Sequence, residues 1–343
     1  MKKLANVFLS LAILLTIGIL WQWEWVSYAF MQAKGQLTIL WRSRRVEEIL
    51  QDAHFPDSLK RKLLLIDQIR RFAEDSLALK QTKNYTTFYH QQGKPLLWVL
   101  TACPPYELKA YQWHFPFLGS FPYKGFFDLE KARQEEKRLQ QQGYDTNIDE
   151  VLGWSTLGWF RDPILSNFLE RDVGQLAELI IHELTHSTLF VPNQVEYNEN
   201  LASFVGQQGA IMFLRHRYGE NSPEMKRYLT DLADKKRFIN FVLKASQSLD
   251  SLYGSFTAQM TESEKLTAKQ QHIQRIIRAF DTVSFTSKQY QRYFANFVPN
   301  NTFFMEFIRY TGQQNYFEEE FHQKFGSNFR RYWAYLRKNY PTL

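Results

Sequence analysis

The chain has 343 residues, 44% of them hydrophobic and 22% charged, which is typical of a folded globular protein rather than a disordered one. Its net charge is +7, but lysine and arginine are scattered and no recognition motif accompanies them, so nucleic acid is not expected as a partner. The single cysteine, Cys103, excludes an intramolecular disulfide and a cysteine-based zinc site.

The N-terminus carries a long apolar segment. Lys2 and Lys3 precede residues 4–21, which contain no charged side chain. This length lies at the boundary between a signal-peptide core and a short membrane-spanning helix. The small residues "SYA" at 27–29 suit a cleavage site, whereas the aromatic "WQWEW" at 21–25 is typical of a spanning helix that meets the membrane interface. We expect residues 1–27 to form an uncleaved anchor in the membrane, with residues 28–343 on its outer side.

The segment after the anchor combines helices with a few short strands. Two helices are expected between residues 28 and 79, the second with an Asp/Ser cap after Pro56. The other elements expected here are a buried strand at 95–103, a short strand near the end of the loop-rich region 104–127, a polar helix at 128–143 that ends at Gly143, and an edge strand at 153–163 that stops at Pro163.

Beyond residue 170 the periodicity is helical almost throughout. Two helices are expected within 173–219, and further helices near 222–247, 258–280, 286–297, 301–311 and 314–338. Asn300 and Asn301, which precede one of them, suit either a helix cap or a site role. The fold class is therefore α+β and mostly helical, with a helical and sheet part at 28–170, the two motif helices, and a helical part at 220–343.

The stretch from His182 to His186 reads H-E-L-T-H. On a helix, two histidines four residues apart share one face and can bind one metal ion. Catalytic zinc takes three protein ligands and leaves a fourth position for water, and Glu183 is placed to accept a proton from that water. The competing interpretation is an amphipathic helix with a surface histidine pair.

The third ligand decides between these interpretations. Glu199 lies on a second apolar-periodic helix after a short loop, and two histidines with one glutamate form a known type of catalytic zinc site. Glu196 is a rival ligand, but it lies at the helix start, where capping and the helix dipole explain an acid. The sequence thus predicts one Zn²⁺ bound by His182, His186 and Glu199.

The segments "HELTH" and "NENLASFV" resemble the gluzincin metallopeptidases, whose third ligand lies in an N-E-x-x-[AS] helix. The segments "YAFMQAKGQL", "IRRFAEDSLAL", "GWSTLGWFRDPIL", "IIHELTHSTLFVPNQVEYNENLASFVGQQGA" and "NNTFFMEFIRY" are more closely similar to the bacterial family of predicted aminopeptidases. This resemblance runs from about Tyr28 to the C-terminus. It implies zinc, peptide substrates, a membrane-associated or secreted setting, and a gluzincin-like core in which a small sheet with an edge strand lies beside the two motif helices.

The resemblance also implies roles for single residues. His182, His186 and Glu199 match the metal ligands, and Glu183 matches the catalytic base. The stretch Ser155, Thr156, Leu157, Gly158 and Trp159 occupies the place of the gluzincin edge strand, which pairs with the backbone of the substrate.

Two further positions follow from the same resemblance. Ser203 stands where thermolysin-like relatives carry an aspartate that orients a histidine, and a hydroxyl there is a weaker partner. Gluzincins also stabilise the oxyanion with a Tyr or His. Tyr310 is our candidate for that role, with His216 and Tyr218 as alternatives.

The function expected from the sequence is zinc-dependent hydrolysis of peptide bonds, as an aminopeptidase acting on small peptides. The resemblance places the protein in the bacterial cell envelope, anchored in the inner membrane with its catalytic domain outside the cytoplasm. The alternative is a membrane-anchored, non-catalytic protein that contains zinc and binds peptides or envelope partners. An intact Glu183 favours the enzyme, because a structural zinc needs no base.

Overall fold

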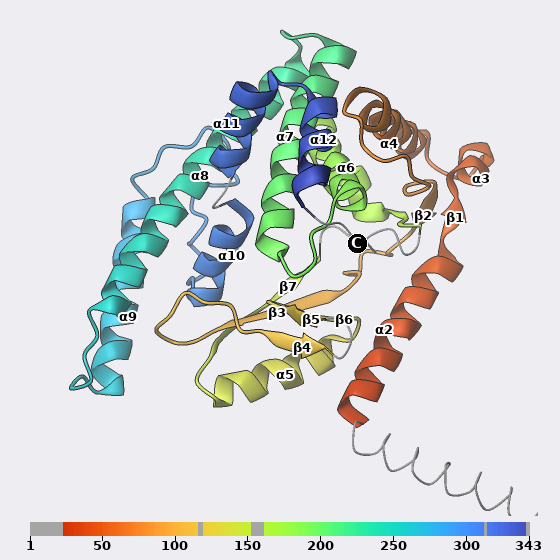
Figure 1. The fold of residues 1–343 in the computed structure, drawn as a ribbon. Helices are drawn as coiled ribbons and strands as arrows, with labels where there is room; N and C mark the ends of the chain where they lie inside the picture. The colour runs from red at the N-terminus through yellow and green to blue at the C-terminus, as the bar shows by residue number, and fades with distance from the viewer. Residues whose placement is uncertain (1–22, 116–118, 152–160, 312–313, 341–343) are drawn as a thin grey trace, which may run out of the picture.

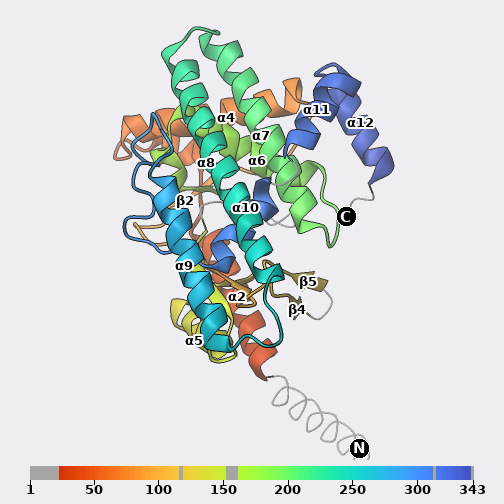
Figure 2. The ribbon, with the colours of Figure 1, turned by 90° about the vertical axis from the view of Figure 1, so that its left-hand side faces the viewer.

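Two long helices from the middle of the chain, α6 (Val173–Thr188) and α7 (Val195–Tyr218), lie side by side at the centre of the molecule (Figure 1). The computed structural model describes residues 23–115, 119–151, 161–311 and 314–340. Over these residues the fold is α+β and mostly helical. Small sheets lie below the central helices and to their right in Figure 1, and further helices lie around them (Figure 2).

The remaining helices surround the central pair. On the N-terminal side they are α2 (Trp23–Arg42), α3 (Val46–Gln51), α4 (Asp57–Ser76), α5 (Leu129–Gln141) and the 3₁₀ helix η1 (Ser166–Glu170). On the C-terminal side they are α8 (Pro223–Gly254), α9 (Glu262–Phe280), α10 (Asn301–Thr311), α11 (Gln314–Phe325) and α12 (Phe329–Asn339).

The strands form short sheets. In one, β3 (Trp98–Cys103) lies between β6 (Lys124–Phe126) and β7 (Asp145–Glu150), antiparallel to both. In another, β2 (Thr87–Tyr89) pairs antiparallel with β1 (Arg44–Arg45) and parallel with β8 (Ile164–Leu165). A third pair consists of β4 (Trp113–Phe115) and β5 (Gly119–Phe121), which are antiparallel.

The buried side chains form a main core and two smaller ones. The main core lies between α4, α6, α7, α11 and α12 and includes the fully buried Tyr332 and Trp333. A second core, rich in phenylalanine, lies between α8, α9 and α10. A third joins α2 and α5 to β3 and β6. The motif helices therefore belong to the main core, which holds their backbones in place.

Local signals explain where the motif helices begin and end. Asp172 starts α6, because its side chain accepts a hydrogen bond from the backbone N–H of Gln175 at 3.0 Å. Gly219 follows α7 with φ of 88°, a conformation that favours glycine. The loop between them is held by Asn198, which donates to the carbonyl oxygen of Val191 and accepts from its N–H, both at 2.8 Å.

Several predicted elements are confirmed. The buried strand expected at 95–103 is β3, and the polar helix before Gly143 is α5, with Gly143 at φ of 86° just after it. Asn300 and Asn301 have structural roles. The Asn300 side chain accepts from the N–H of Thr302 at 3.1 Å, and Asn301 is fully buried and donates to the carbonyl oxygens of Pro104 and Pro105.

Other local predictions were wrong. Residues 286–297 form turns rather than a helix, because Arg292 has φ of 61° and the aromatic side chains of this segment pack onto α8 and α9. The helix expected at 314–338 is divided into α11 and α12 at Gly326 and Ser327, which both have positive φ. Pro56 itself is the N-cap residue of α4, with no side-chain cap there.

Two predicted segments lie outside the described residues, namely the N-terminal apolar segment 4–21 and most of the edge strand at 153–163. Among the helices that the structure describes, none has the length and apolar character needed to cross a bilayer.

Candidate metal centre and its cavity

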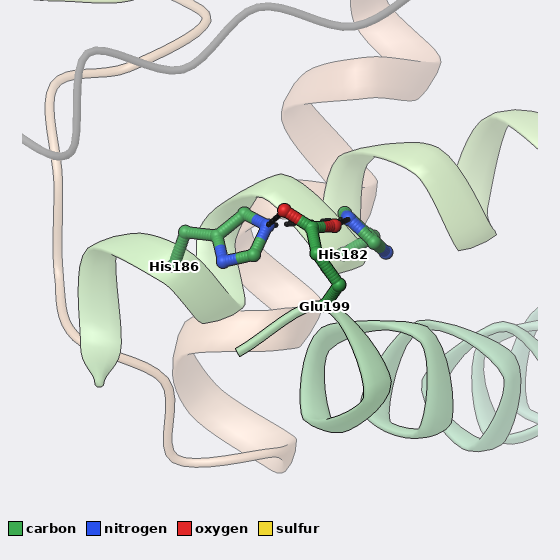
Figure 3. Close-up of side chains that lie close together, drawn as sticks. All are labelled: His182, His186 and Glu199. Carbon is green, nitrogen blue, oxygen red and sulfur yellow. Dashed lines mark hydrogen bonds and ion pairs between the residues drawn. The ribbon is translucent and has the colours of Figure 1, made fainter. Parts of the chain in front are cut away.

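Three side chains from the motif helices converge on one point (Figure 3). His182 and His186 project from α6, and Glu199 reaches between them from α7. The Nε2 atoms of the two histidines lie 3.2 Å apart. The carboxylate oxygens of Glu199 lie 3.3 Å from Nε2 of His182 and 3.6 Å from Nε2 of His186. Among the described residues, this is the group of three whose ligand atoms lie close enough to share a metal ion.

The size of this triangle suits a small cation. A tetrahedral zinc ion with Zn–N bonds of about 2.0–2.1 Å places neighbouring ligand atoms about 3.3 Å apart. The three measured separations, two of which join the histidines to different carboxylate oxygens of Glu199, lie close to that value. The donor set of two imidazole nitrogens and one carboxylate is also one that zinc accepts. The residues therefore fit the metal that the sequence predicts, without rearrangement of the helices.

Close packing of the two helices sets this triangle. Gly206 of α7 faces α6, and a Cβ atom there would lie 2.8 Å from the carbonyl oxygen of Glu178 and 3.2 Å from Cβ of His182. Only glycine lets the backbones approach this closely beside the first histidine. The buried Asn198, next to Glu199, fixes the start of α7 through its two hydrogen bonds to Val191.

The electrostatics of the triad are those of a coupled acid–base cluster. Burial raises the pKa of Glu199, but the two histidines outweigh this effect and hold the pKa far below its usual value. Burial lowers the pKa of His186, but the charge of Glu199 outweighs it and leaves that pKa raised. The Glu199 carboxylate is therefore ionised, as a metal ligand must be.

A cavity of about 620 Å³ opens beside the triad, a volume within the range of small-molecule sites. His182, Glu183 and Ser203 line it at the metal end. Its far wall is apolar and aromatic, formed by Leu232, Phe238, Ile239, Tyr290, Tyr293 and Phe307 from α8, α10 and the turns before α10. A peptide has a polar backbone and can carry apolar side chains. The polar end of the cavity matches the backbone, and the apolar wall matches such side chains.

Carboxylates outnumber cations in the cavity lining. Its acidic residues are Glu178, Glu183, Asp231 and Glu306, and its basic ones are Arg171 and Lys235. Glu178 accepts hydrogen bonds from Nζ of Lys235 at 2.7 Å and from the hydroxyl of Tyr228 at 2.9 Å. Burial and nearby acids raise the pKa of Asp231. The excess of negative charge favours a cationic group in this cavity.

Tyr85 is a neighbour of the centre that sequence reasoning missed. Its hydroxyl is buried and has no hydrogen-bond partner among the described residues. Burial and the negative charges of Glu183 and Asp162 raise its pKa well above the usual value. Its backbone has φ of 62°, and its N–H donates to the carbonyl oxygen of Asp162 at 2.7 Å. A positive φ is uncommon for a non-glycine residue, and the residue type alone does not predict it.

The same loop reaches the motif helix through Asn84. Its side chain donates to a carboxylate oxygen of Asp162 at 3.2 Å and to the hydroxyl of Ser187 at 3.3 Å. Ser187 directly follows His186. The loop before β2 is thus bonded to the helix turn that carries the second histidine.

The other predicted residues fall into separate places. Ser203 lines the cavity beside His182. Glu196 lies in the first turn of α7 and is not part of the three-residue group. His216 packs on the ring of Phe72, about 26 Å along α7 from Glu199, and Tyr218 lies a further half-turn away, so neither alternative reaches the centre.

Two predictions cannot be placed at the centre from the structure. Tyr310 belongs to α10, but its side chain lies outside the described part of the chain. The stretch from Ser155 to Trp159 lies outside it as well.

The fold and the centre together define an α+β protein with a candidate metal site, formed by two helices at the edge of a cavity. The family described as "Putative aminopeptidase" matches residues 27–340, and the chain belongs to this family. This confirms the family resemblance found in the sequence and indicates peptidase activity at the level of the family. The searches of curated proteins and of solved structures found no match.

Proposed function

We propose that this protein is a gluzincin-type zinc aminopeptidase that hydrolyses small peptides in the cavity beside His182, His186 and Glu199. The observation that carries this proposal is the triangle of ligand atoms, sized for one small cation, at the end of a cavity that Glu183 also lines. Membership of the aminopeptidase family supports the same reaction class.

The chemistry divides between the metal and the protein. When bound, zinc lowers the pKa of a water molecule and polarises the peptide carbonyl. Glu183 takes a proton from the attacking water and returns it to the amine that leaves, so that one peptide bond and one water give a carboxylate and an ammonium ion. Glu183 is 9% exposed, so little bulk water competes for its carboxylate.

The charge of the cavity supports recognition of a free N-terminus. Glu178 is already paired with Lys235, but the carboxylates of the lining still outnumber its cations, so an ammonium group would be attracted to the cavity. The aromatic wall of Phe238, Tyr293 and Phe307 would accept an apolar side chain of the substrate. We accordingly expect peptides with a free amino terminus and a large apolar residue to be cleaved fastest.

The test compares the full-length protein with Glu183→Gln. Both should bind one zinc ion per chain by elemental analysis, because Glu183 is not a ligand. Peptide cleavage should fall by about 10²–10⁴-fold in the variant, the usual contribution of a general base. Peptides with free and acetylated N-termini, compared in the same assay, separate an aminopeptidase from an endopeptidase.

Two results would contradict the proposal. Stoichiometric zinc without cleavage above the level of Glu183→Gln would favour the non-catalytic, peptide-binding alternative. A wild-type protein that binds no zinc would contradict both.

A further inference from the structure

Helix α2 carries an apolar face that no part of the described structure covers. Five large apolar side chains on it are exposed: Trp23 (60%), Val26 (37%), Phe30 (72%), Leu37 (61%) and Trp41 (90%). At about 100° per residue, all five fall within an arc of roughly 60° along roughly 27 Å of helix. Single exposed apolar residues are common, but five large ones on one face of a helix, with Lys34 between Phe30 and Leu37, mark an interaction surface.

The helix cannot turn this stripe inward, because its other face is already bonded to the protein. The Tyr28 hydroxyl donates to the carbonyl oxygen of Gly125 at 2.9 Å, and the Gln32 side chain donates to the same oxygen at 2.6 Å. Gly35 lies against the ring of Phe127, where a Cβ atom would come within 2.2 Å of it. The contacts of α2 with β6 and its neighbourhood thus fix the stripe outward, at the edge of the molecule in Figure 1.

We propose that this stripe, from Trp23 to Trp41, lies in the interfacial region of a lipid bilayer. The chain on the N-terminal side of α2 supports a lipid partner, because residues 4–21 are uncharged and apolar and lead directly into the stripe. The composition of the stripe supports it as well, since tryptophan and phenylalanine are favoured where hydrocarbon meets headgroups. This proposal does not depend on the proposed catalytic function.

The charges along α2 favour lipid over a second copy of the chain. The stripe has the spacing of a coiled-coil seam, but such seams are normally flanked by charged residues that pair between helices. Between Glu24 and Arg42 the helix has a single charged residue, Lys34. Viewed down the helix axis, Lys34 lies about 20° from the direction that Trp23 and Trp41 share. Its ammonium group can therefore reach lipid phosphates while its aliphatic part stays on the apolar face.

The test measures the depth of single labels in the full-length protein reconstituted in vesicles of phosphatidylethanolamine and phosphatidylglycerol. The substitutions Phe30→Cys and Leu37→Cys place an environment-sensitive fluorophore on the stripe, at exposed sites that tolerate it. Leu229→Cys, at an exposed position of α8 far from α2, is the matched control (Figures 1 and 2). The native Cys103 is buried, and labelling of the wild type measures its background.

With nitroxide groups on the lipid acyl chains, the two stripe labels should be quenched several-fold more strongly than the Leu229 label. Equal and weak quenching at all three positions would overturn the proposal. Stripe labels that are shielded from water but unquenched by lipid, and that quench one another between copies, would also overturn it in favour of a dimer.

Discussion

Two glutamates of this protein, the partly buried Glu199 and the buried Glu135, have similar surroundings, but only Glu199 is a candidate metal ligand. Each lies among nitrogen-bearing side chains. The partners of Glu135 are permanent donors: Arg138 bonds both of its oxygens at 2.9 Å, Trp113 donates at 3.0 Å, and Nζ of Lys124 lies at 3.6 Å. The partners of Glu199 are imidazoles, whose neutral ring nitrogens can also donate a lone pair to a metal ion.

This difference distinguishes an acid with a structural role from one that is available to bind a ligand. Around Glu135 the charges are compensated and the polar atoms are paired, which gives rigidity and leaves no capacity for a ligand. Around the candidate metal centre, Nδ1 of His186 and the hydroxyl of Tyr85 are buried without a hydrogen-bond partner among the described residues, and His182 lines a cavity. Unsatisfied buried groups are costly for folding, so they point to a role in binding.

The largest effect should come from Glu199, the third ligand of the proposed metal centre. Glu199→Gln should bind zinc at least about 100-fold more weakly, since even outer-shell partners of a metal site contribute 10–100-fold. Peptide cleavage should be lost with the metal. Glu196→Gln, three residues earlier on the same helix, is the matched control and should keep both. Zinc affinity is measured by competition with a chelator. An equal loss of zinc in the two variants would show that Glu199 is not the third ligand.

Glu135→Gln should instead lower stability and leave zinc binding unchanged. Burial raises the pKa of Glu135, but Arg138, Trp113 and Lys124 outweigh this and lower it to about 2, from 4.5. The difference corresponds to about 3 kcal/mol of unfolding free energy at neutral pH. Because the folded pKa is the lower one, this contribution is present above pH 4.5 and is lost as the pH falls towards 2.

Chemical denaturation of wild type and Glu135→Gln at neutral and acidic pH measures this contribution. The gap between the two proteins should shrink on acidification. A gap that is independent of pH would mean that Glu135 acts by packing rather than by its charge.

The smallest effect expected is that of Tyr85→Phe. If the hydroxyl acts on the substrate, kcat should fall by about tenfold, within the lower range of oxyanion and acid–base contributions. The melting temperature should stay equal or rise, because the hydroxyl that is removed is buried and has no hydrogen-bond partner among the described residues. Tyr197→Phe is the control, as Tyr197 is also a buried tyrosine but its ring packs between Phe317 and Tyr340. An unchanged kcat in Tyr85→Phe would leave the tyrosine with a structural role.

The parts of the site that could be predicted are those encoded by spacing within one or two helices. His182, Glu183 and His186 share a helix, and Glu199 follows after a short loop, so periodicity alone brings them together. Glu178 and Ser203 lie one turn from this set on the same two helices. Lys235, Tyr290 and Phe307 come from elements far along the chain, and only the tertiary fold shows that they line the same cavity.

The errors in the fold have a related cause. The turns at 286–297 have helical periodicity, but their aromatic side chains gain more by packing onto Phe238 and Phe280 than from one further helix. The N–H of Ser287 is also bonded by the buried carboxylate of Asp234, at 2.6 Å. Local propensity is a weak signal, and contacts with residues distant in sequence override it here.

The close approach at Gly206 has a consequence for ion selectivity. The gap between the two helices determines how far Glu199 stands from the two histidines, and therefore which ionic radius the three side chains can share. Calcium, with bonds of about 2.3–2.6 Å and a preference for oxygen, needs a wider and different cage. Gly206 has no side chain and is not a ligand, but it would thus help to determine the size of the ion that the candidate centre can hold.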